Sequence, residues 1–174
     1  MLNGKKIELV AFEKKDMQLL HKWNNDPEVI KYFRDPEPES TEQEKKWFER
    51  LVEKENAKTF TVILDKQPIG VIYLSQIDWR DRNARLSIII GEKDKWGKGY
   101  GTDAVLTLVE FAFEELNLHR IELDVFAVNK KAIRCYEKAG FAVEGIKKDK
   151  FFLDGKYIDC PIMARLNNMH SKKS

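Results

Sequence analysis

The sequence predicts a single α/β domain of the α+β type, with a mixed sheet of about seven strands flanked by helices. The length of 174 residues suits one core, because a chain of this size buries most of its apolar surface in one domain. No internal repeat or low-complexity linker divides the chain. Strand and helix signals do not alternate strictly, as they would in a doubly wound parallel sheet. The domain is expected to span residues 1–166, followed by a frayed polar tail, 167–174.

The N-terminal region is predicted to contain one strand and two short helices. Residues Ile7–Phe12 alternate weakly between apolar and polar side chains, as a strand does. Residues Asp16–Asn24 place their apolar side chains on one side of a helix. Asp26 precedes Pro27, and an N-cap residue followed by proline commonly starts a helix, so a helix Pro27–Phe33 is expected.

A further helix is expected after the proline-containing loop Arg34–Glu39. Ser40 or Thr41 would start it, because Gln43 or Glu44 stands three residues later, as in a capping box. Its buried stripe, at helical spacing, would consist of Trp47, Phe48, Leu51 and Val52.

The middle of the chain is predicted to form three successive strands. Thr59–Leu64 and Ile69–Ile77 flank a turn at Asp65–Pro68, and a charged turn at Asp78–Asn83 leads to the strand Arg85–Ile90. Such short connections favour antiparallel pairing.

The C-terminal half is predicted to hold two helices and the remaining strands. A helix runs from about Asp103 to Leu116, and Ile121–Val125 alternates apolar residues with acids, as a strand does. Asn129 can cap a second helix, and Gly140 suits the left-handed position that ends it. The chain closes with a hairpin that turns at Asp154-Gly155.

Composition argues against a nucleic acid or a membrane as the main partner. Thirty-one Lys and Arg residues balance 29 Asp and Glu residues, and the net charge is +2. No apolar run approaches the roughly 20 residues of a membrane span, and no secretory signal is visible. Cys135 and Cys160 have neither metal-ligand nor disulfide spacing, so they are expected to be packing residues in a reducing compartment. The sequence therefore predicts a cytoplasmic protein without a bound metal.

The stretch Lys95–Thr102, with the sequence KWGKGYGT, is the strongest functional signal. Its three glycines stand at every second position, after an apolar strand and before a helix. Such a loop presents backbone N–H groups at a helix N-terminus, where the helix dipole also favours an anion. A phosphate or pyrophosphate group is therefore the expected ligand of this loop.

The glycine spacing leaves several alternatives. The loop lacks the G-x-x-x-x-G-K-S/T pattern of a nucleoside triphosphate site. A dinucleotide site needs G-x-G-x-x-G, whereas this loop reads G-x-G-x-G, although Glu122 and Asp124 follow at about the distance of a ribose-binding acid. Glycines that serve only a tight turn are the remaining alternative.

Two motifs in this chain resemble those of the GNAT (Gcn5-related) N-acetyltransferases. Gly99 and Gly101 match the family pyrophosphate loop R/Q-x-x-G-x-G/A, with Trp96 in place of Arg or Gln. Residues 129–141 resemble the family's second motif, N-x-x-A-x-x-x-Y-x-x-x-G-F. The resemblance covers essentially the whole chain and is nearest to the branches that acetylate ribosomal-protein N-termini and spermidine or spermine. It implies the GNAT fold and acetyl transfer from acetyl-CoA to a primary amine by direct attack on the thioester.

The resemblance also implies which residues bind the co-substrate. Backbone groups of the strand before the loop would pair with the pantetheine arm, the loop amides would bind the pyrophosphate, and the second motif would add its first turn. The implied set is Ile88, Ile89, Ile90, Lys95, Trp96, Gly97, Lys98, Gly99, Tyr100, Gly101, Thr102, Asn129, Lys131 and Ala132.

Tyr136 occupies the position of the family's general acid. A phenol, with an ordinary pKa of about 10, is protonated at neutral pH and can donate its proton as the thiolate develops. The acceptor ammonium must lose a proton, but Arg85 stands where many relatives place a Glu. Glu92 follows the same strand and is expected to be a surface carboxylate. The base therefore stays unassigned.

The sequence leaves the acceptor open among a protein N-terminus, a polyamine and an amino sugar. Residues 28–44 hold six acids and two bases, a local charge that would concentrate a cationic amine. Arg34 and Arg85 stand where polyamine-modifying relatives carry acids, which argues the other way. The alternative from another class is an acyl-CoA-binding module without turnover. A homodimer is a further expectation.

Overall fold

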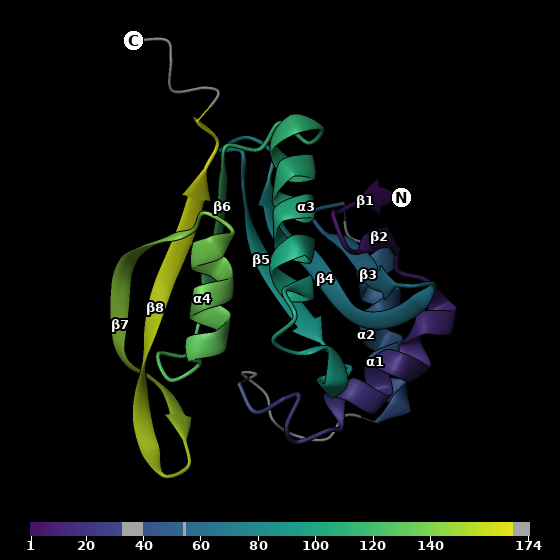
Figure 1. Cartoon of the computed structure of the whole chain (residues 1–174), viewed down its shortest axis with the longest axis horizontal. Coiled ribbons are helices and arrows are strands. Elements are labelled where there is room, and N and C mark those ends of the chain that lie inside the picture. The colour runs from purple at the N-terminus through teal and green to yellow at the C-terminus, as the bar shows by residue number, and fades with distance from the viewer. Residues whose placement is uncertain (33–39, 54, 169–174) are drawn as a thin grey trace.

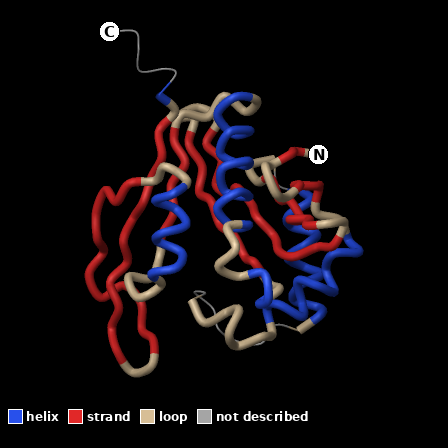
Figure 2. Tube along the Cα trace, viewed as in Figure 1, coloured by secondary structure: helices blue, strands red, loops and turns tan. Residues whose placement is uncertain are grey.

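The protein is an α/β domain built on one eight-stranded mixed sheet (Figures 1 and 2). The computed structural model describes residues 1–32, 40–53 and 55–168. The strand order is β1-β2-β3-β4-β5-β6-β8-β7, and every neighbouring pair is antiparallel except β5 and β6. The predicted fold class is confirmed, with β1 as a strand too short to give a periodic signal.

The strands are β1 (Leu2–Asn3), β2 (Glu8–Ala11), β3 (Lys58–Leu64), β4 (Gln67–Asp78), β5 (Asn83–Ile90), β6 (Arg120–Asp124), β7 (Ala142–Leu153) and β8 (Lys156–Leu166). The helices are α1 (Met17–Asn24), α2 (Thr41–Glu53), α3 (Tyr100–Glu114) and α4 (Lys130–Lys138), with short 3₁₀ helices η1 (Lys14–Asp16) and η2 (Lys93–Lys95).

Helices cover both faces of the sheet. Neighbouring side chains of a strand point to opposite faces, so one strand can contribute to the core on each side. Ile72 of β4 belongs to the larger core, together with Leu108 of α3, on the face that carries α3 and α4 (Figure 1). Val71, the preceding residue, packs with Trp23 of α1 and Ile89 of β5 in a smaller cluster on the other face. The central strands β4 and β5 are thereby buried on both sides.

The start of α2 follows the predicted capping box. Ser40 N–H donates to Gln43 Oε1 at 2.8 Å, and Gln43 N–H donates to Ser40 Oγ at 3.2 Å. Trp47 and Phe48 of the predicted stripe both lie with ring centroids 5.9 Å from Phe12. The side chains of Leu51 and Val52 lie outside the described residues.

The predicted helix Pro27–Phe33 is wrong over residues 27–32, which form turns. Asp26 does act as a cap, because its side-chain Oδ1 accepts from Glu28 N–H at 3.0 Å, and its carbonyl oxygen accepts from Val29 and Ile30 N–H, each at 3.0 Å. Val29 and Ile30 are buried, and an isolated helical turn has little stability of its own, so tertiary burial decides the local conformation. Phe33 and the predicted loop Arg34–Glu39 lie outside the described residues.

Residues with positive φ fix several element ends. Gly99 (φ 86°) is the N-cap of α3, so this helix begins at Tyr100, earlier than the expected start near Asp103. The predicted hairpin turn at Asp154-Gly155 is confirmed, with φ of 49° and 76°. Gly140 follows α4 with φ 84°, as predicted.

The ordered domain extends beyond its expected end. Asn167 is buried, and its N–H donates to His119 O at 2.8 Å, so the prediction of a frayed tail is wrong at this residue. Residues 169–174 lie outside the described part of the chain. Among the described helices, none has the length and apolar character needed to cross a bilayer.

Candidate active site

Strands β5 and β6 are parallel neighbours that separate after a short contact. They pair only at Asn83↔Arg120, Ala84↔Ile121 and Arg85↔Glu122. Beyond this point the edge of β5 that faces β6 has no strand partner in the described part of the chain, while its other edge stays paired with β4 as far as Ile90. A strand edge of this kind can accept an extended, peptide-like ligand. Ile88, Ile89 and Ile90 lie on this stretch, but only Ile88 and Ile90 turn their backbone groups to the free edge, because those of Ile89 face β4.

The glycine loop connects the end of β5 to the N-terminus of α3. Gly97 and Gly99 adopt positive φ values of 75° and 86°, which non-glycine residues rarely do. Within the described residues, the N–H groups from Gly97 to Thr102 donate to no other backbone group, so they form a set of available donors. The dipole of α3 adds a partial positive charge at the same place. This arrangement fits a pyrophosphate group.

Two residues of the loop differ from the expectation. Lys95 N–H donates to Glu92 O at 3.0 Å, and Trp96 N–H donates to Lys93 O at 3.2 Å, so neither amide is available to a ligand. The indole Nε1 of Trp96 instead donates to Ile90 O at 2.6 Å. This bond ties the loop to the end of β5 and occupies the Ile90 carbonyl. The sequence carried no signal for it, because it depends on the path of the intervening chain.

The first turn of α4 is closed by its own cap. Asn129 Oδ1 accepts from Ala132 N–H at 3.2 Å, so the Ala132 amide, predicted to bind the co-substrate, is already used. The side-chain nitrogen of Asn129 retains its donors for a ligand. Lys131 is exposed in the same turn.

Tyr136 lies buried on α4, with 8% of its surface exposed. Its ring centroid is 6.0 Å from that of Phe141. Burial raises the pKa of the Tyr136 phenol well above its ordinary value, and Cys135 and Tyr73 add to this effect. Cys135 Sγ also accepts a hydrogen bond from Thr102 Oγ1 at 3.4 Å, which holds α4 against the first turn of α3. The helix that carries the candidate general acid therefore contacts the helix that follows the candidate phosphate loop.

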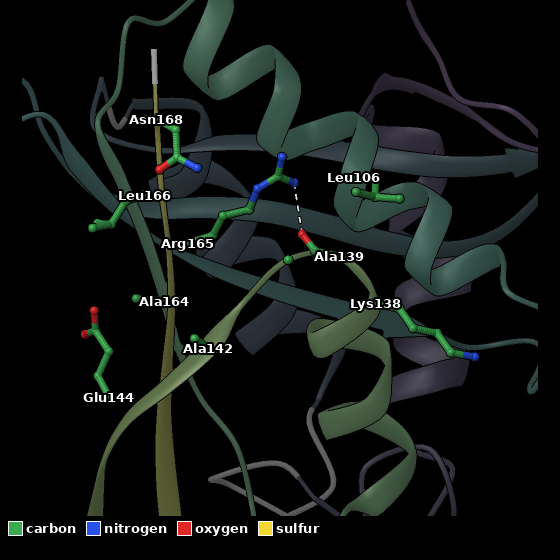
Figure 3. A pocket seen from close by; sticks show the side chains of 10 residues that line it. Leu106, Lys138, Ala139, Ala142, Glu144, Ala164, Arg165, Leu166 and Asn168 are labelled. Atoms are coloured by element: carbon green, nitrogen blue, oxygen red, sulfur yellow. Dashed lines mark hydrogen bonds between the residues drawn. The ribbon is translucent and has the colours of Figure 1, made fainter. Parts of the chain in front are cut away.

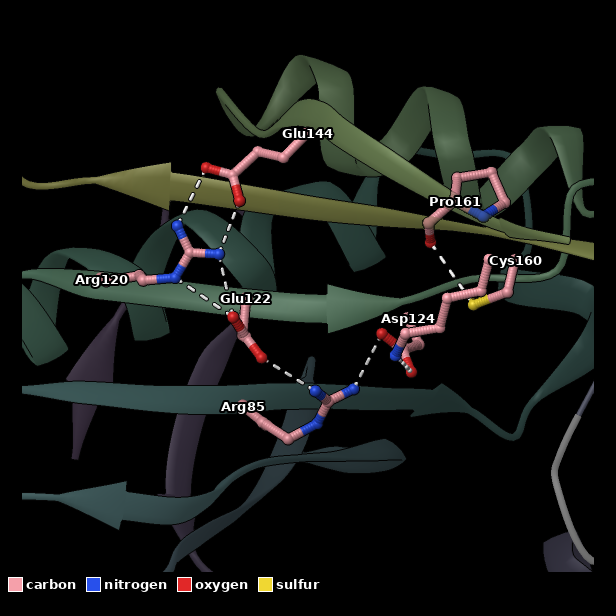
Figure 4. A network of polar contacts seen from close by, with 8 residues as sticks. Arg85, Arg120, Glu122, Asp124, Glu144, Cys160 and Pro161 are labelled. Atoms are coloured by element: carbon pink, nitrogen blue, oxygen red, sulfur yellow. Dashed lines mark hydrogen bonds and ion pairs between the residues drawn. The ribbon is translucent and has the colours of Figure 1, made fainter. Parts of the chain in front are cut away.

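Arg85 lies where β5 and β6 stop pairing, and it binds two acids of β6 (Figure 4). Its Nη1 donates to Glu122 Oε1 at 2.9 Å, and its Nη2 forms an ion pair with Asp124 Oδ1 at 3.1 Å. Lys147 Nζ lies 3.2 Å from Asp124 Oδ2, and Arg120 Nη2 lies 2.9 Å from Glu122 Oε2. Burial alone would raise the pKa of Asp124, but Arg85 and Lys147 outweigh it and lower that pKa. Both acids are thus held by cations of the protein, which disfavours the dinucleotide alternative.

Glu92, just after β5, accepts hydrogen bonds from two side chains of α1. Its Oε1 accepts from Lys22 Nζ at 2.9 Å and from Trp23 Nε1 at 3.0 Å. These two hydrogen bonds, that of Lys22 first, lower the pKa of Glu92. A Cβ on the neighbouring Gly91 would lie 2.1 Å from the Trp23 ring, so this close packing requires glycine. Glu92 is therefore a partly exposed carboxylate, as the sequence suggested, whose hydrogen bonds also connect α1 to the end of β5.

The acidic stretch 28–44 is described only in part. Residues 33–39, and with them Arg34, lie outside the described residues, as does the side chain of Glu44. Glu28 Oε2 lies 2.6 Å from Lys93 Nζ, which also lies 2.9 Å from Asp26 Oδ2. At least this acid is therefore neutralised by a neighbouring lysine.

An open depression lies away from the glycine loop, between α3, the end of α4 and strands β7 and β8 (Figure 3). Arg165 Nη1 crosses it to donate to Ala139 O at 2.9 Å. The depression is lined by Leu106, Lys138, Ala139, Gly140, Ala142, Glu144, Ala164, Arg165, Leu166 and Asn168. None of these residues belongs to the predicted site. Among the described residues, no group of three or more His, Cys, Asp and Glu side chains is arranged to hold a metal ion.

Comparison with known proteins identifies relatives along nearly the whole chain. A sequence profile of the acetyltransferase (GNAT) domain matches residues 6–142. The spermidine N(1)-acetyltransferase of Vibrio cholerae is 31% identical over 170 residues, covering 97% of each chain. The aminoglycoside N(6')-acetyltransferase type 1 of Klebsiella pneumoniae is 26% identical over 151 residues, which span 80% of this chain and 75% of that protein.

A solved structure has the same fold. The crystal structure of spermidine N-acetyltransferase from Vibrio cholerae in complex with CoA and spermine superposes with a TM-score of 0.86 at 31% identity. The match covers 92% of this chain and 95% of that one. The residues matched by the profile include strands β5 and β6 and the glycine loop. The chain therefore belongs to the GNAT acetyltransferase family and is an N-acetyltransferase that uses acetyl-CoA.

Proposed function

We propose that this enzyme acetylates a primary amine of a polyamine, with spermidine as the leading acceptor. The relative that is 31% identical over 97% of this chain is named for spermidine, and a solved structure of high similarity contains CoA and spermine. The available amides at the N-terminus of α3 carry the proposal for the donor, because they match the pyrophosphate of CoA in charge and in donor number.

In this proposal, three groups of residues bind acetyl-CoA. The amides from Gly97 to Thr102 bind the pyrophosphate, and the free edge of β5, at the backbone of Ile88 and the N–H of Ile90, orients the pantetheine arm. Asn129 adds a side-chain donor near the start of α4. Acetyl-CoA supplies the activated acyl group, which a neutral amine attacks with release of a thiolate.

Tyr136 is the proposed donor of the proton that the thiolate takes up. Burial keeps its phenol protonated throughout the physiological range. The same apolar surroundings also make a thiolate more basic, so donor and acceptor stay matched.

The proposal assigns no carboxylate as the base. Glu92, Glu122 and Asp124 are each bound to a cationic side chain of the protein. The acceptor therefore enters as its neutral amine, and its proton goes to solvent.

Thiol release from acetyl-CoA, measured with spermidine, a peptide N-terminus and an aminoglycoside, tests this function. Tyr136→Phe is expected to lower kcat about 100-fold, because it removes a general acid, while CoA affinity stays unchanged. Tyr157→Phe is the matched control, since Tyr157 is 67% exposed at the β7–β8 hairpin. Equal kcat values for wild type and Tyr136→Phe would rule out the role of Tyr136.

An amino sugar is the second candidate acceptor. The aminoglycoside-modifying relative supports it. A higher kcat/KM for the aminoglycoside than for spermidine would select this acceptor. Tight CoA binding by calorimetry without turnover of any amine would favour a binding module instead.

We place the reaction in the cytoplasm, which the free thiols of Cys135 and Cys160 support. The homodimer stays a prediction.

A further inference from the structure

Lys6, which lies outside both sequence motifs, reaches the glycine loop. Its Nζ donates to Lys98 O at 3.3 Å. The same atom lies 3.6 Å from the position that a Cβ would take on Gly99, the N-cap of α3. An ammonium group therefore stands directly at the end of α3 where the available amides lie.

Asp103 holds the backbone of Lys6 in this position. The Asp103 carboxylate is buried and accepts three backbone hydrogen bonds, from Lys5 at 3.1 Å, Lys6 at 2.6 Å and Ile7 at 3.1 Å. A Cβ on Gly4 would lie 2.7 Å from Asp103 Oδ2, so the segment packs closely against the first turn of α3. Because the backbone is fixed, less conformational entropy is lost when the side chain binds a ligand.

The charge of Lys6 is not neutralised by the protein. Two other lysines near the loop are paired: Lys95 with Asp94 at 2.8 Å, and Lys93 with Asp26 at 2.9 Å. The ammonium of Lys6, by contrast, contacts a carbonyl oxygen and no carboxylate within the described residues. A carbonyl leaves the positive charge available to an anion.

We propose that Lys6 Nζ binds the pyrophosphate group of CoA, and that Asp103 is the positioning residue that keeps Lys6 at the loop. This proposal rests on the proposed co-substrate site at the N-terminus of α3. The phosphate contact would come from the N-terminal strand region, in addition to the amides of the glycine loop.

Calorimetric titration of the enzyme with CoA tests the proposal without any turnover. Lys6→Ala is expected to raise Kd about fivefold to tenfold and to make it less dependent on salt, because one charged contact is lost. Lys6→Arg should restore most of the affinity. Lys5→Ala is the matched control: it removes the same charge from the neighbouring position and should leave Kd within about twofold of wild type. Equal Kd values for Lys6→Ala and Lys5→Ala would overturn the proposal.

Dephospho-CoA, which keeps the pyrophosphate but lacks the ribose 3′-phosphate, separates two sources of the contact. The Lys6→Ala loss should be as large with dephospho-CoA as with CoA. A loss confined to CoA would move the contact to the 3′-phosphate and contradict the assignment.

Asp103→Asn tests the positioning role. It should weaken CoA binding, and in combination with Lys6→Ala it should add no further loss, because Asp103 acts through Lys6. Additive losses would show that Asp103 acts independently. Thermal melts identify a folding defect in the Asp103 variant, and the surface variant Lys6→Ala decides the proposal in that case. If wild type binds CoA but acetylates no amine, the proposed function fails while the Lys6 result still stands.

Discussion

Arg85 binds two acidic side chains of the neighbouring strand and so keeps them from acting as ligands or bases. It holds Glu122 and Asp124, which share a face of β6 because they alternate with the buried Ile121 and Leu123. The alternation was visible in the sequence. The partner was not, because parallel pairing joins strands that are separated by α3, and its register depends on the packing of that helix.

Arg85→Met should reduce the free energy of unfolding by about 1–3 kcal/mol at neutral pH, since it leaves two partly buried carboxylates with fewer partners. The pKa of Asp124 is lowered in the folded protein, so its contribution to stability is present above its unfolded pKa and is lost as pH falls through the folded value. The difference between wild type and variant should therefore shrink between about pH 5 and pH 3.

Urea denaturation at several pH values measures this difference. Arg80→Met, at an exposed residue of the turn after β4, is the control and should change stability little. A loss that stays the same at acid pH would mean that Arg85 stabilises through packing and not through Asp124.

At the scale of elements, the loop between β5 and α3 owes its shape to contacts at both ends. Gly99 caps α3, and the Trp96 indole anchors the loop to the last carbonyl of β5. The glycine pattern and the helix that follows it were predictable, because both depend on local conformation. The anchor was not, and neither was the contact of Lys6 with the loop, because both depend on tertiary positions.

Trp96→Phe should keep the ring but remove the hydrogen bond to Ile90 O. Stability is expected to fall by about 1 kcal/mol, the usual contribution of such a bond. The KM for acetyl-CoA should rise severalfold, because the loop amides are no longer held in register. Steady-state kinetics and chemical denaturation measure both effects, with Trp79→Phe, at a side chain that is 48% exposed, as the control. Equal behaviour of the two variants would show that the Trp96 indole does not anchor the loop.

The difference between local and tertiary constraints also explains which secondary-structure predictions were correct. Hairpins at Asp154-Gly155 and helix ends at Gly140 follow from residues that tolerate positive φ, and they were predicted correctly. The segment after Asp26 has equally good helix-start residues, yet it forms turns because Val29 and Ile30 are buried there. Local signals therefore succeed where the backbone itself is constrained and fail where packing competes.

At the scale of the whole molecule, the sheet consists of two parts with a narrow connection. One part contains β1 to β5 and the other β6, β8 and β7, and within the described residues the strands of the two parts pair only at the start of β5 and β6. Binding of CoA along the free edge of β5 should therefore slow amide hydrogen exchange at Ile88 and Ile90, whose N–H groups face away from β4. At a concentration about 100 times its Kd, CoA should also stabilise the fold by about 2.7 kcal/mol. Unchanged exchange at these residues in saturated enzyme would contradict pairing with β5.

The gap between β5 and β6 has a kinetic consequence. Acetyl-CoA and CoA share the pyrophosphate and the pantetheine arm, so in the proposed binding mode both occupy the same edge of β5, and loss of the acetyl group removes few contacts. The enzyme should therefore leave each cycle with its product still bound, and CoA release should limit turnover, as in many efficient enzymes. Free CoA should then inhibit competitively with acetyl-CoA, which would couple the rate of acetylation to the ratio of the two in the cell.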